Sequence, residues 1–151
     1  MKSVLLVLLC LFTIEGALKA QSRKPSSAQQ KAIIALINSY SEAREKSDTM
    51  LLKNILTEDV DQLVSTGEWR TGIAAAIEGM LKSSASKPGT RTLAVDKIRM
   101  LDAKCAIVDC RYEIENPNKT IRKMWSSFTV VLDRSSWKIT AIRNMLPAGG
   151  N

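Results

Sequence analysis

The sequence predicts an α+β domain in which N-terminal helices pack on a strongly curved antiparallel sheet. Two observations carry this prediction. Apolar residues recur at helical spacing through residues 28–46, and after residue 90 the chain alternates apolar and polar residues as extended strands do. A sheet curled around a long first helix encloses a conical cavity, so we expect a hollow α+β barrel.

The first two predicted helices lie between residues 28 and 56. The apolar stripe of the first helix consists of Ile33, Leu36, Ile37, Tyr40 and Ala43. Ser47 and Asp48 end this helix and cap a second, shorter one, which residues 57–59 stop. The apolar face of the second helix consists of Leu51, Leu52, Ile55 and Leu56.

Shorter elements follow in the middle of the chain. Residues 60–65 predict a strand, and residues 66–68 predict a turn. Trp69 and Arg70 begin the return strand. A third helix is expected over residues 73–82, followed by a loop over residues 83–89.

Four strands are expected to complete the domain. They cover residues 91–101, 104–115, 120–132 and 137–146, and turn residues separate the last three. One inward row of side chains comprises Ala106, Val108, Cys110, Tyr112 and Ile114, and the next comprises Met124, Ser126, Phe128, Val130 and Leu132. The opposite faces carry Trp125, Val131, Trp137 and Ile139 and suggest a partner surface, so we expect a homodimer formed through the sheet.

The N-terminus is typical of a secretory signal. Lys2 precedes an uncharged apolar run of eleven residues, which is too short for the roughly 20 residues of a membrane-spanning helix, and Ala20 offers a cleavage point. We therefore expect a signal peptide at residues 1–20, a disordered leader at 21–27, one domain at 28–147 and a C-terminal tail at 148–151. The protein would be exported to the periplasm or secreted, with no stable membrane anchor after cleavage. The alternative is an uncleaved N-terminal anchor.

Composition argues against several kinds of chemistry. The chain has no histidine, which removes the commonest general base and metal ligand, and neither a metal site nor a cofactor is predicted. Its formal charge of +7 is spread along the chain with few aromatic residues, so no nucleic-acid partner is expected. Cys105 and Cys110 would point to opposite faces of one strand, and we expect two free, largely buried thiols.

A set of short motifs carries a resemblance that covers residues 30–146. The motifs are Ile37-x-x-Tyr40-x-x-Ala43, Asp48, Leu52, Leu56-Thr57-Glu58-Asp59-Val60, Gly67-x-x-Arg70-x-Gly72 and Ala76-Ile77. Their spacing resembles the NTF2-like (cystatin-like cone) superfamily, and within it the SnoaL-like proteins of the DUF4440 type. The resemblance implies the cone fold and not an activity, because the superfamily contains enzymes, ligand carriers and dimerisation modules.

Ketosteroid isomerase is the most informative comparison within this superfamily. Its site uses a tyrosine on the first helix, which Tyr40 matches. The positions of its base and of its later acid fall near Val64 and Ser126, where this chain has no carboxylate. The resemblance therefore implies that steroid-type isomerisation through that pair of acids is absent.

Six residues are candidates for binding a ligand inside the cone: Tyr40, Trp69, Arg70, Tyr112, Ser126 and Asn144. Arg70 could clamp a carboxylate or phosphate, or pair with Glu68 or Asp61. Ser126 and Asn144 could bond each other, a buried water or a ligand.

Three functions remain open from the sequence alone. The preferred one is an exported protein that binds a small, partly apolar ligand, with or without an anionic group. The second is a small enzyme that uses Asp59 or Asp61 with Tyr40 for proton transfer or hydrolysis. The third is a dimerisation module without a ligand.

Overall fold

The computed structural model describes residues 24–148, and the expected signal peptide lies outside them. The elements follow the order α1 (Ser27–Lys46), α2 (Thr49–Ile55), β1 (Leu56–Leu63), β2 (Trp69–Thr71), α3 (Ile73–Ser86), β3 (Thr90–Met100), β4 (Cys105–Glu115), β5 (Ile121–Asp133) and β6 (Ser136–Met145). The six strands form one sheet in the order β2-β1-β6-β5-β4-β3. The β1–β6 pair is parallel and the other pairs are antiparallel, so the predicted α+β class is confirmed.

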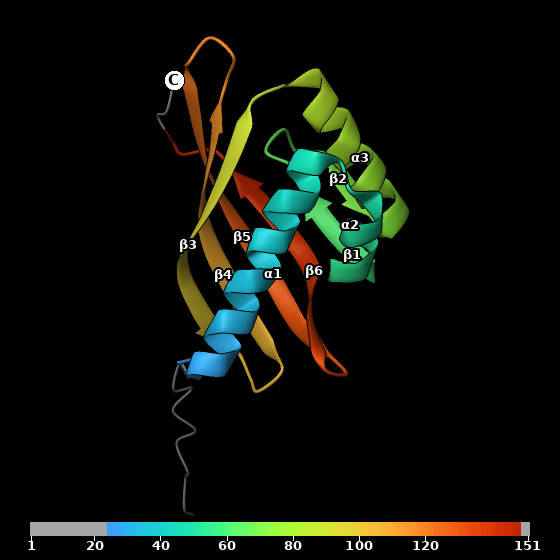
Figure 1. The fold of residues 1–151 in the computed structure, drawn as a ribbon, viewed down its shortest axis with the longest axis vertical. Coiled ribbons are helices and arrows are strands. Elements are labelled where there is room, and N and C mark those ends of the chain that lie inside the picture. The colour runs from blue at the N-terminus through green and yellow to red at the C-terminus, as the bar shows by residue number, and fades with distance from the viewer. Residues whose placement is uncertain (1–23, 149–151) are drawn as a thin grey trace, which may run out of the picture.

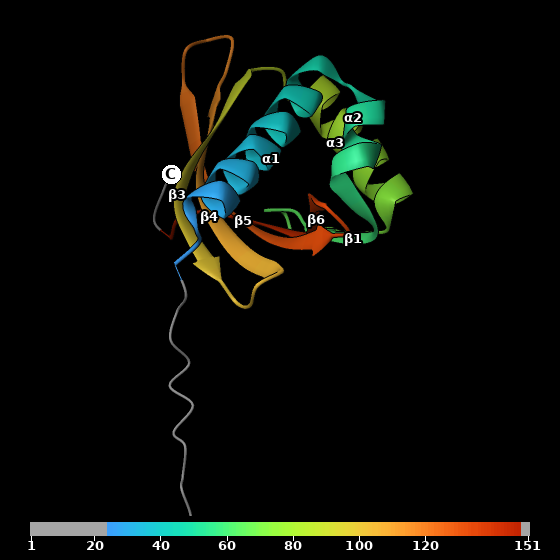
Figure 2. The ribbon, with the colours of Figure 1, turned by 60° about the horizontal axis from the view of Figure 1, so that its bottom comes forward.

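The sheet curls around α1, which lies in its concave face, while α2 and α3 lie beside it over β1 (Figures 1 and 2). The middle of this cone is filled with side chains. Tyr40 of α1 meets Phe128 of β5 edge-on, with ring centroids 5.3 Å apart, and both residues are buried. Such aromatic pairs add packing energy beyond the apolar area they bury. The cone is therefore solid at the level of Tyr40.

Local sequence explains the starts of both N-terminal helices. Ser26 and Gln29 form a capping box, in which each side chain accepts a hydrogen bond from the other residue's backbone N–H. Helix α1 therefore begins at Ser27, inside the segment for which the sequence predicted a disordered leader. Asp48 caps α2 by accepting a bond from the N–H of Leu51 at 2.9 Å, as predicted.

Two element boundaries differ from the sequence prediction. Strand β1 starts at Leu56 rather than at residue 60, because Leu56 is buried and pairs with Ile139 of the parallel strand β6. The polar residues 57–59 lie where the β1–β6 register shifts. Helix α3 continues to Ser86 rather than ending at residue 82, because nothing interrupts it before Pro88.

A bulge in β6 corrects the prediction for the outer face. The β5–β6 register shifts between Thr129 and Val130, so Ile139 turns inward beside Val130 and is fully buried. Trp137 is half-buried against the core, whereas Trp125 stays exposed on the outer face. The expected partner surface is therefore smaller than the alternation pattern predicted.

The two cysteines of the described chain are free thiols, as expected. Cys110 is buried on the inner face of β4, and Cys105 is partly exposed. Burial, with Asp109 nearby, raises the pKa of Cys110 to about 12, so its reactive thiolate is suppressed.

Candidate functional site

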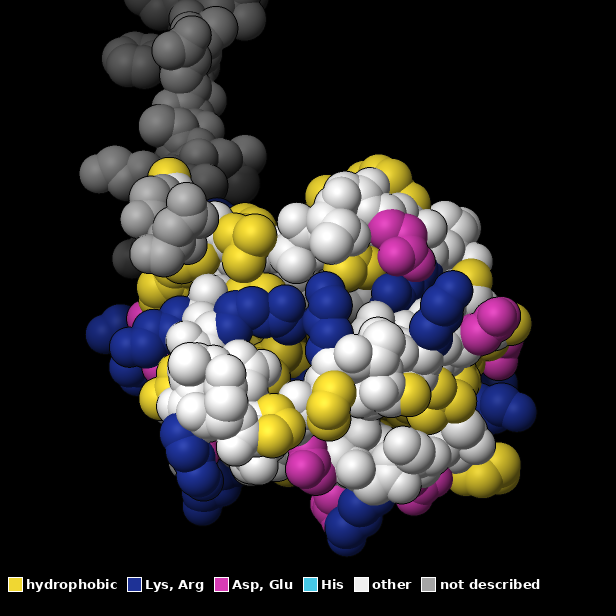
Figure 3. All heavy atoms as spheres, turned by 90° about the horizontal axis from the view of Figure 1, so that it is seen from above, with side chains coloured by type: hydrophobic (Ala, Val, Ile, Leu, Met, Phe, Trp, Pro, Cys, Tyr) yellow, Lys and Arg dark blue, Asp and Glu magenta, His cyan; other side chains and the backbone are white. Residues whose placement is uncertain are grey.

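A pocket opens at the end of the cone where α1 and α3 finish. Its volume is about 50 Å³, which is room for about three or four water-sized groups. It is lined by Arg44, Gln62, Val64, Ser65, Arg70, Ser83, Lys87, Arg91, Tyr112, Ile114, Arg122, Met124 and Asn144. From this end, Lys and Arg side chains form a band across the middle of the molecule beside a hollow (Figure 3).

Arg44 brings a positive charge to the inner side of this pocket from the last turn of α1. Its side chain is largely buried, with 9% of the residue exposed. One guanidinium nitrogen, Nη1, donates to the hydroxyl oxygen of Tyr40 at 3.1 Å, and Nη2 donates to Oγ of Ser84 at 3.4 Å. The third, Nε, is buried without a partner. A buried charged donor without a partner costs the folded protein free energy.

Tyr40 itself supports Arg44 rather than lining the pocket. Its hydroxyl accepts the Arg44 bond, and the Arg44 guanidinium carbon lies 5.9 Å from the centre of its ring. Burial raises the pKa of Tyr40 above its ordinary value, which the charge of Arg44 offsets only in part. The pocket therefore lies nearer the C-terminal end of α1 than Tyr40 does, and Arg44 is the α1 residue that lines it.

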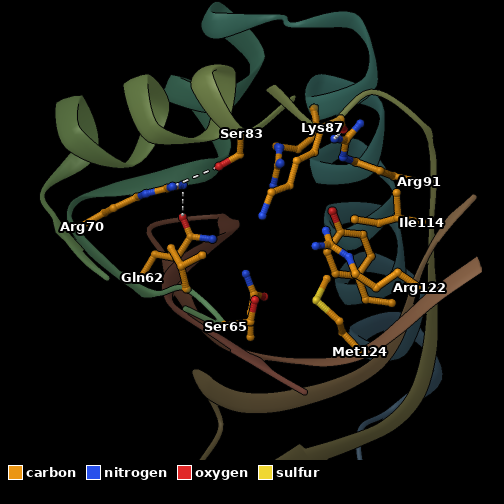
Figure 4. A pocket seen from close by; sticks show the side chains of 13 residues that line it. Gln62, Ser65, Arg70, Ser83, Lys87, Arg91, Ile114, Arg122 and Met124 are labelled. Atoms are coloured by element: carbon orange, nitrogen blue, oxygen red, sulfur yellow. Dashed lines mark hydrogen bonds between the residues drawn. The ribbon is translucent and has the colours of Figure 1, made fainter. Parts of the chain in front are cut away.

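Arg70 crosses the pocket wall from β2 and is held on three sides (Figure 4). Its Nε donates to Oε1 of Glu68 at 2.8 Å, Nη1 donates to Oε1 of Gln62 at 3.4 Å, and Nη2 donates to Oγ of Ser83 at 3.0 Å. The bond from Arg70 lowers the pKa of the Glu68 carboxyl. Gly79 of α3 has no side chain to collide with the Arg70 guanidinium. Glu68 therefore already balances the charge of Arg70.

Lys87, Arg91 and Arg122 complete the basic lining around the same central space (Figure 4). Arg91 donates to the carbonyl oxygens of Gly89 at 3.0 Å and Lys87 at 2.7 Å, so it holds the loop after α3 in place. The Nε atoms of Arg91 and Arg122 are buried without a partner.

The four cations Arg44, Lys87, Arg91 and Arg122 share one property. None of them forms an ion pair with a carboxylate among residues 24–148. The pocket lining contains no Asp or Glu either. The site therefore carries a strong positive excess, and it suits a negatively charged group.

The rest of the wall combines apolar and neutral polar side chains. Tyr112, Ile114 and Met124 form a small packed cluster on β4 and β5. Asn144 lines the pocket, and its Oδ1 accepts a bond at 2.6 Å from Oγ of the buried Ser126. Ser126 and Asn144 thus bond each other, and Asn144 is the one that lines the cavity.

Besides Tyr40 and Ser126, three more predicted site residues lie outside the pocket lining. Trp69 is 56% exposed on the outer face, where Arg143 stacks over its ring at 4.8 Å. Asp61 also faces outward and makes two 3.0 Å bonds to Arg143, while Asp59 is exposed. The neighbouring Gln62 is the β1 residue that points inward. Trp69 is therefore no pocket wall, and no carboxylate of β1 converges with Tyr40.

Sequence reasoning missed four of the five basic residues of the lining. The alternation that placed Met124 and Ser126 inward also places Arg122 inward, and Arg44 follows Tyr40 by one helical turn. Those two signals were present. Lys87 and Arg91 lie around a loop, for which periodicity makes no prediction.

Solved structures share this fold at low sequence identity. A domain of unknown function with a cystatin-like fold from Nostoc punctiforme superposes with a TM-score of 0.72 and 16% identity, over 82% of this chain and 80% of that one. An NTF-2 like protein of unknown function from Shewanella oneidensis has a TM-score of 0.65 and 19% identity, over 77% and 98%. An NTF2-like protein from Novosphingobium aromaticivorans has a TM-score of 0.69 and 17% identity, over 80% and 83%.

The chain therefore has the NTF2-like, cystatin-like fold that its motifs predicted. At these identities the likeness shows the fold alone, and the SnoaL-like subtype stays a prediction. No protein-family model matches the sequence, and neither does a curated protein. Within residues 24–148, no helix has the length and apolar character needed to cross a bilayer, and no three Cys, Asp or Glu side chains cluster as metal ligands.

Proposed function

We propose that this exported domain binds a small organic anion at the open end of its cone. The observation that carries the proposal is the set of four cations, Arg44, Lys87, Arg91 and Arg122, which share one pocket without a carboxylate partner. The anionic group would lie among them. The apolar part of the ligand would lie against Tyr112, Ile114 and Met124. Export rests on the sequence of residues 1–20.

Electrostatics favours this occupant over a neutral one. Charges held together in a partly dry pocket repel one another, and buried guanidinium nitrogens without partners have lost their bonds to water. A carboxylate or phosphate would supply charge-assisted hydrogen bonds to these nitrogens, and such bonds are the stronger class. Binding would then relieve a cost that the free protein carries.

The placement of the acids weighs against the proposed enzyme. Asp61 is engaged with Arg143 on the outer face, and Asp59 is exposed. Val64 lines the pocket at the position where the resemblance to ketosteroid isomerase expects a base. Tyr40 is buried behind Arg44, and its raised pKa keeps the phenol protonated near neutral pH. A general base is therefore missing from the described lining, and binding is the better proposal.

Titration calorimetry with a homologous series tests this function. Hexanol, hexanoate and hexyl phosphate share an apolar chain and differ in charge. We expect the two anions to bind and hexanol to bind at least about tenfold more weakly, since one unit charge near several cations contributes more than about 1.4 kcal/mol. Equal affinity for hexanol, or no binding by either anion, would overturn the proposal.

A pair of matched variants locates the binding at this pocket. Arg122→Gln removes a pocket cation while keeping a side chain of similar length, and we expect it to weaken hexanoate and hexyl phosphate binding about tenfold or more. Arg99→Gln removes a charge from an exposed position of β3 that is not part of the lining. The Arg99 variant should bind as the unaltered protein does; equal losses in both variants would indicate only a general effect of net charge.

A further inference from the structure

The charge balance of the pocket indicates how many negative charges the bound group carries. Glu68 neutralises Arg70 at 2.8 Å, but Arg44, Lys87, Arg91 and Arg122 remain uncompensated. A single negative charge would leave three of these four cations without a counter-charge. A doubly charged group would gain roughly twice the Coulomb attraction from the same side chains.

The distribution of the uncompensated cations points to the same kind of group. Arg44 of α1, Arg91 of β3 and Arg122 of β5 line the space from three separate elements. A carboxylate offers two oxygens in one plane. A phosphate monoester offers three terminal oxygens around a tetrahedral centre, so it can meet cations on several sides at once.

We infer that the headgroup bound at this site is a phosphate monoester carrying two negative charges; this inference rests on the proposed function. The cavity holds the headgroup alone, because about 50 Å³ accommodates a few water-sized atoms and no more. The organic part of the ester would begin against Tyr112, Ile114 and Met124 and extend out of the pocket. Ser65, Ser83 and the amide of Asn144 are neutral donors within the same lining.

A comparison of two isosteric amphiphiles tests the charge of the headgroup. Hexyl phosphate and hexyl sulfate both present three terminal oxygens, but near pH 8 the phosphate carries two charges and the sulfate one. We expect hexyl phosphate to bind at least about tenfold more tightly at pH 8. Inorganic phosphate is the third ligand in this comparison. It should bind more weakly than hexyl phosphate, because it has no apolar chain to contact Tyr112, Ile114 and Met124.

The pH dependence of binding then reports the ligand's own titration. The charged and titratable groups that face the headgroup are Arg44, Arg70 with Glu68, Lys87, Arg91, Tyr112 and Arg122. With no histidine in the chain, no side chain here ordinarily titrates between pH 5 and 8. A phosphate monoester dianion takes up one proton near pH 6 and becomes a monoanion, so its apparent affinity should fall about tenfold from pH 8 to pH 5. Hexyl sulfate affinity should stay constant.

The outcomes separate this inference from the function on which it rests. If neither amphiphile binds, the proposed anion pocket is wrong. If both bind equally, or if hexyl phosphate affinity does not change with pH, the pocket stands and the doubly charged headgroup is wrong. Inorganic phosphate binding as tightly as hexyl phosphate would overturn the ester part of the inference.

A charge variant adds a test that needs no buried substitution. Lys87 is exposed at the end of α3, so Lys87→Gln should fold normally, which thermal unfolding without ligand checks. Because Coulomb attraction scales with ligand charge, the variant should lose more affinity for hexyl phosphate than for hexyl sulfate. The Arg99→Gln protein should keep the ratio of hexyl phosphate affinity to hexyl sulfate affinity that the unaltered protein has. An unchanged ratio in the Lys87 variant would count against the dianion.

Discussion

At the scale of single residues, Tyr40 and Arg44 determine where the solid part of the cone ends. The Tyr40 ring packs against Phe128, and its hydroxyl accepts a bond from Arg44 Nη1. With Nη1 and Nη2 engaged, the remaining nitrogen of Arg44 is the unpartnered one. In the proposed function, the tyrosine that resembles a catalytic residue of ketosteroid isomerase would position the cation Arg44.

Replacing Tyr40 with phenylalanine is expected to weaken both stability and binding. The ring contact with Phe128 is kept, but a charged, buried nitrogen of Arg44 loses its acceptor, which costs about 1–3 kcal/mol. Chemical denaturation measures the free energy of unfolding, and titration with hexyl phosphate measures the affinity. A variant that is destabilised yet binds normally would show that Tyr40 does not position Arg44.

The pH dependence of stability reports the burial of the Tyr40 hydroxyl. Burial raises the pKa of Tyr40 in the folded protein above its ordinary value of 10.0. Above pH 10 the unfolded chain therefore loses this proton more readily, and stability falls as pH rises. Below pH 10 the contribution is complete. The free energy of unfolding should fall less steeply above pH 10 in Tyr40→Phe than in the unaltered protein.

At the scale of elements, the turn from α3 into β3 carries part of the site. Arg91 donates to the carbonyls of Lys87 and Gly89, and its side chain lines the pocket. Gly89 has a φ of +154°, and a Cβ there would lie 2.6 Å from the backbone oxygen of Glu115. Gly89 is therefore the position where the loop after α3 packs closely against the end of β4, next to the pocket cation Arg91.

Gly89→Ala is expected to destabilise the protein by about 1–3 kcal/mol and to weaken anion binding, because neither backbone can move without disturbing Arg91. Gly67→Ala is the matched control. Gly67 also has a positive φ, +90°, but no atom lies within 4 Å of an added Cβ. The control shares the backbone strain without the collision. Equal stability loss and intact binding in both variants would mean that the approach to Glu115 does not matter.

Periodicity predicted most elements and only part of the site. Strands such as β4 were predictable because one face is buried, which forces strict alternation from Ala106 to Ile114. The bulge that turns Ile139 inward depends on pairing with β5, and the start of β1 depends on pairing with β6. Neither contact is local in sequence. The direction of Asp61 and Gln62 was likewise unpredictable, because a shift of one residue exchanges the two faces.

At the scale of the whole molecule, the two faces of the sheet differ in chemistry. The concave face holds the core and the basic pocket. The convex face exposes Trp125 opposite Met145 on adjacent strands, and Trp69 lies farther along it beside Arg143. A shallow hollow of about 270 Å³ adjoins Trp125 and is lined by Asp96, Lys97 and Asp109 among others. Apolar and charged groups side by side are typical of protein interfaces, so the expected homodimer stays our proposal.

Substituting Trp125 with glutamate tests that proposal while sparing the pocket. Trp125 is 40% exposed and points away from the cone, so the change should cost little stability in a monomer. A charge in the centre of an interface of about 800 Å² per partner would instead disrupt the dimer. Native mass spectrometry and size-exclusion chromatography should give two copies for the original protein and one for Trp125→Glu. Because the pocket belongs to a single chain, hexyl phosphate affinity should be the same in both proteins. If the original protein is a monomer, the proposed homodimer is wrong. If the variant loses hexyl phosphate binding, the formation of the dimer shapes the pocket.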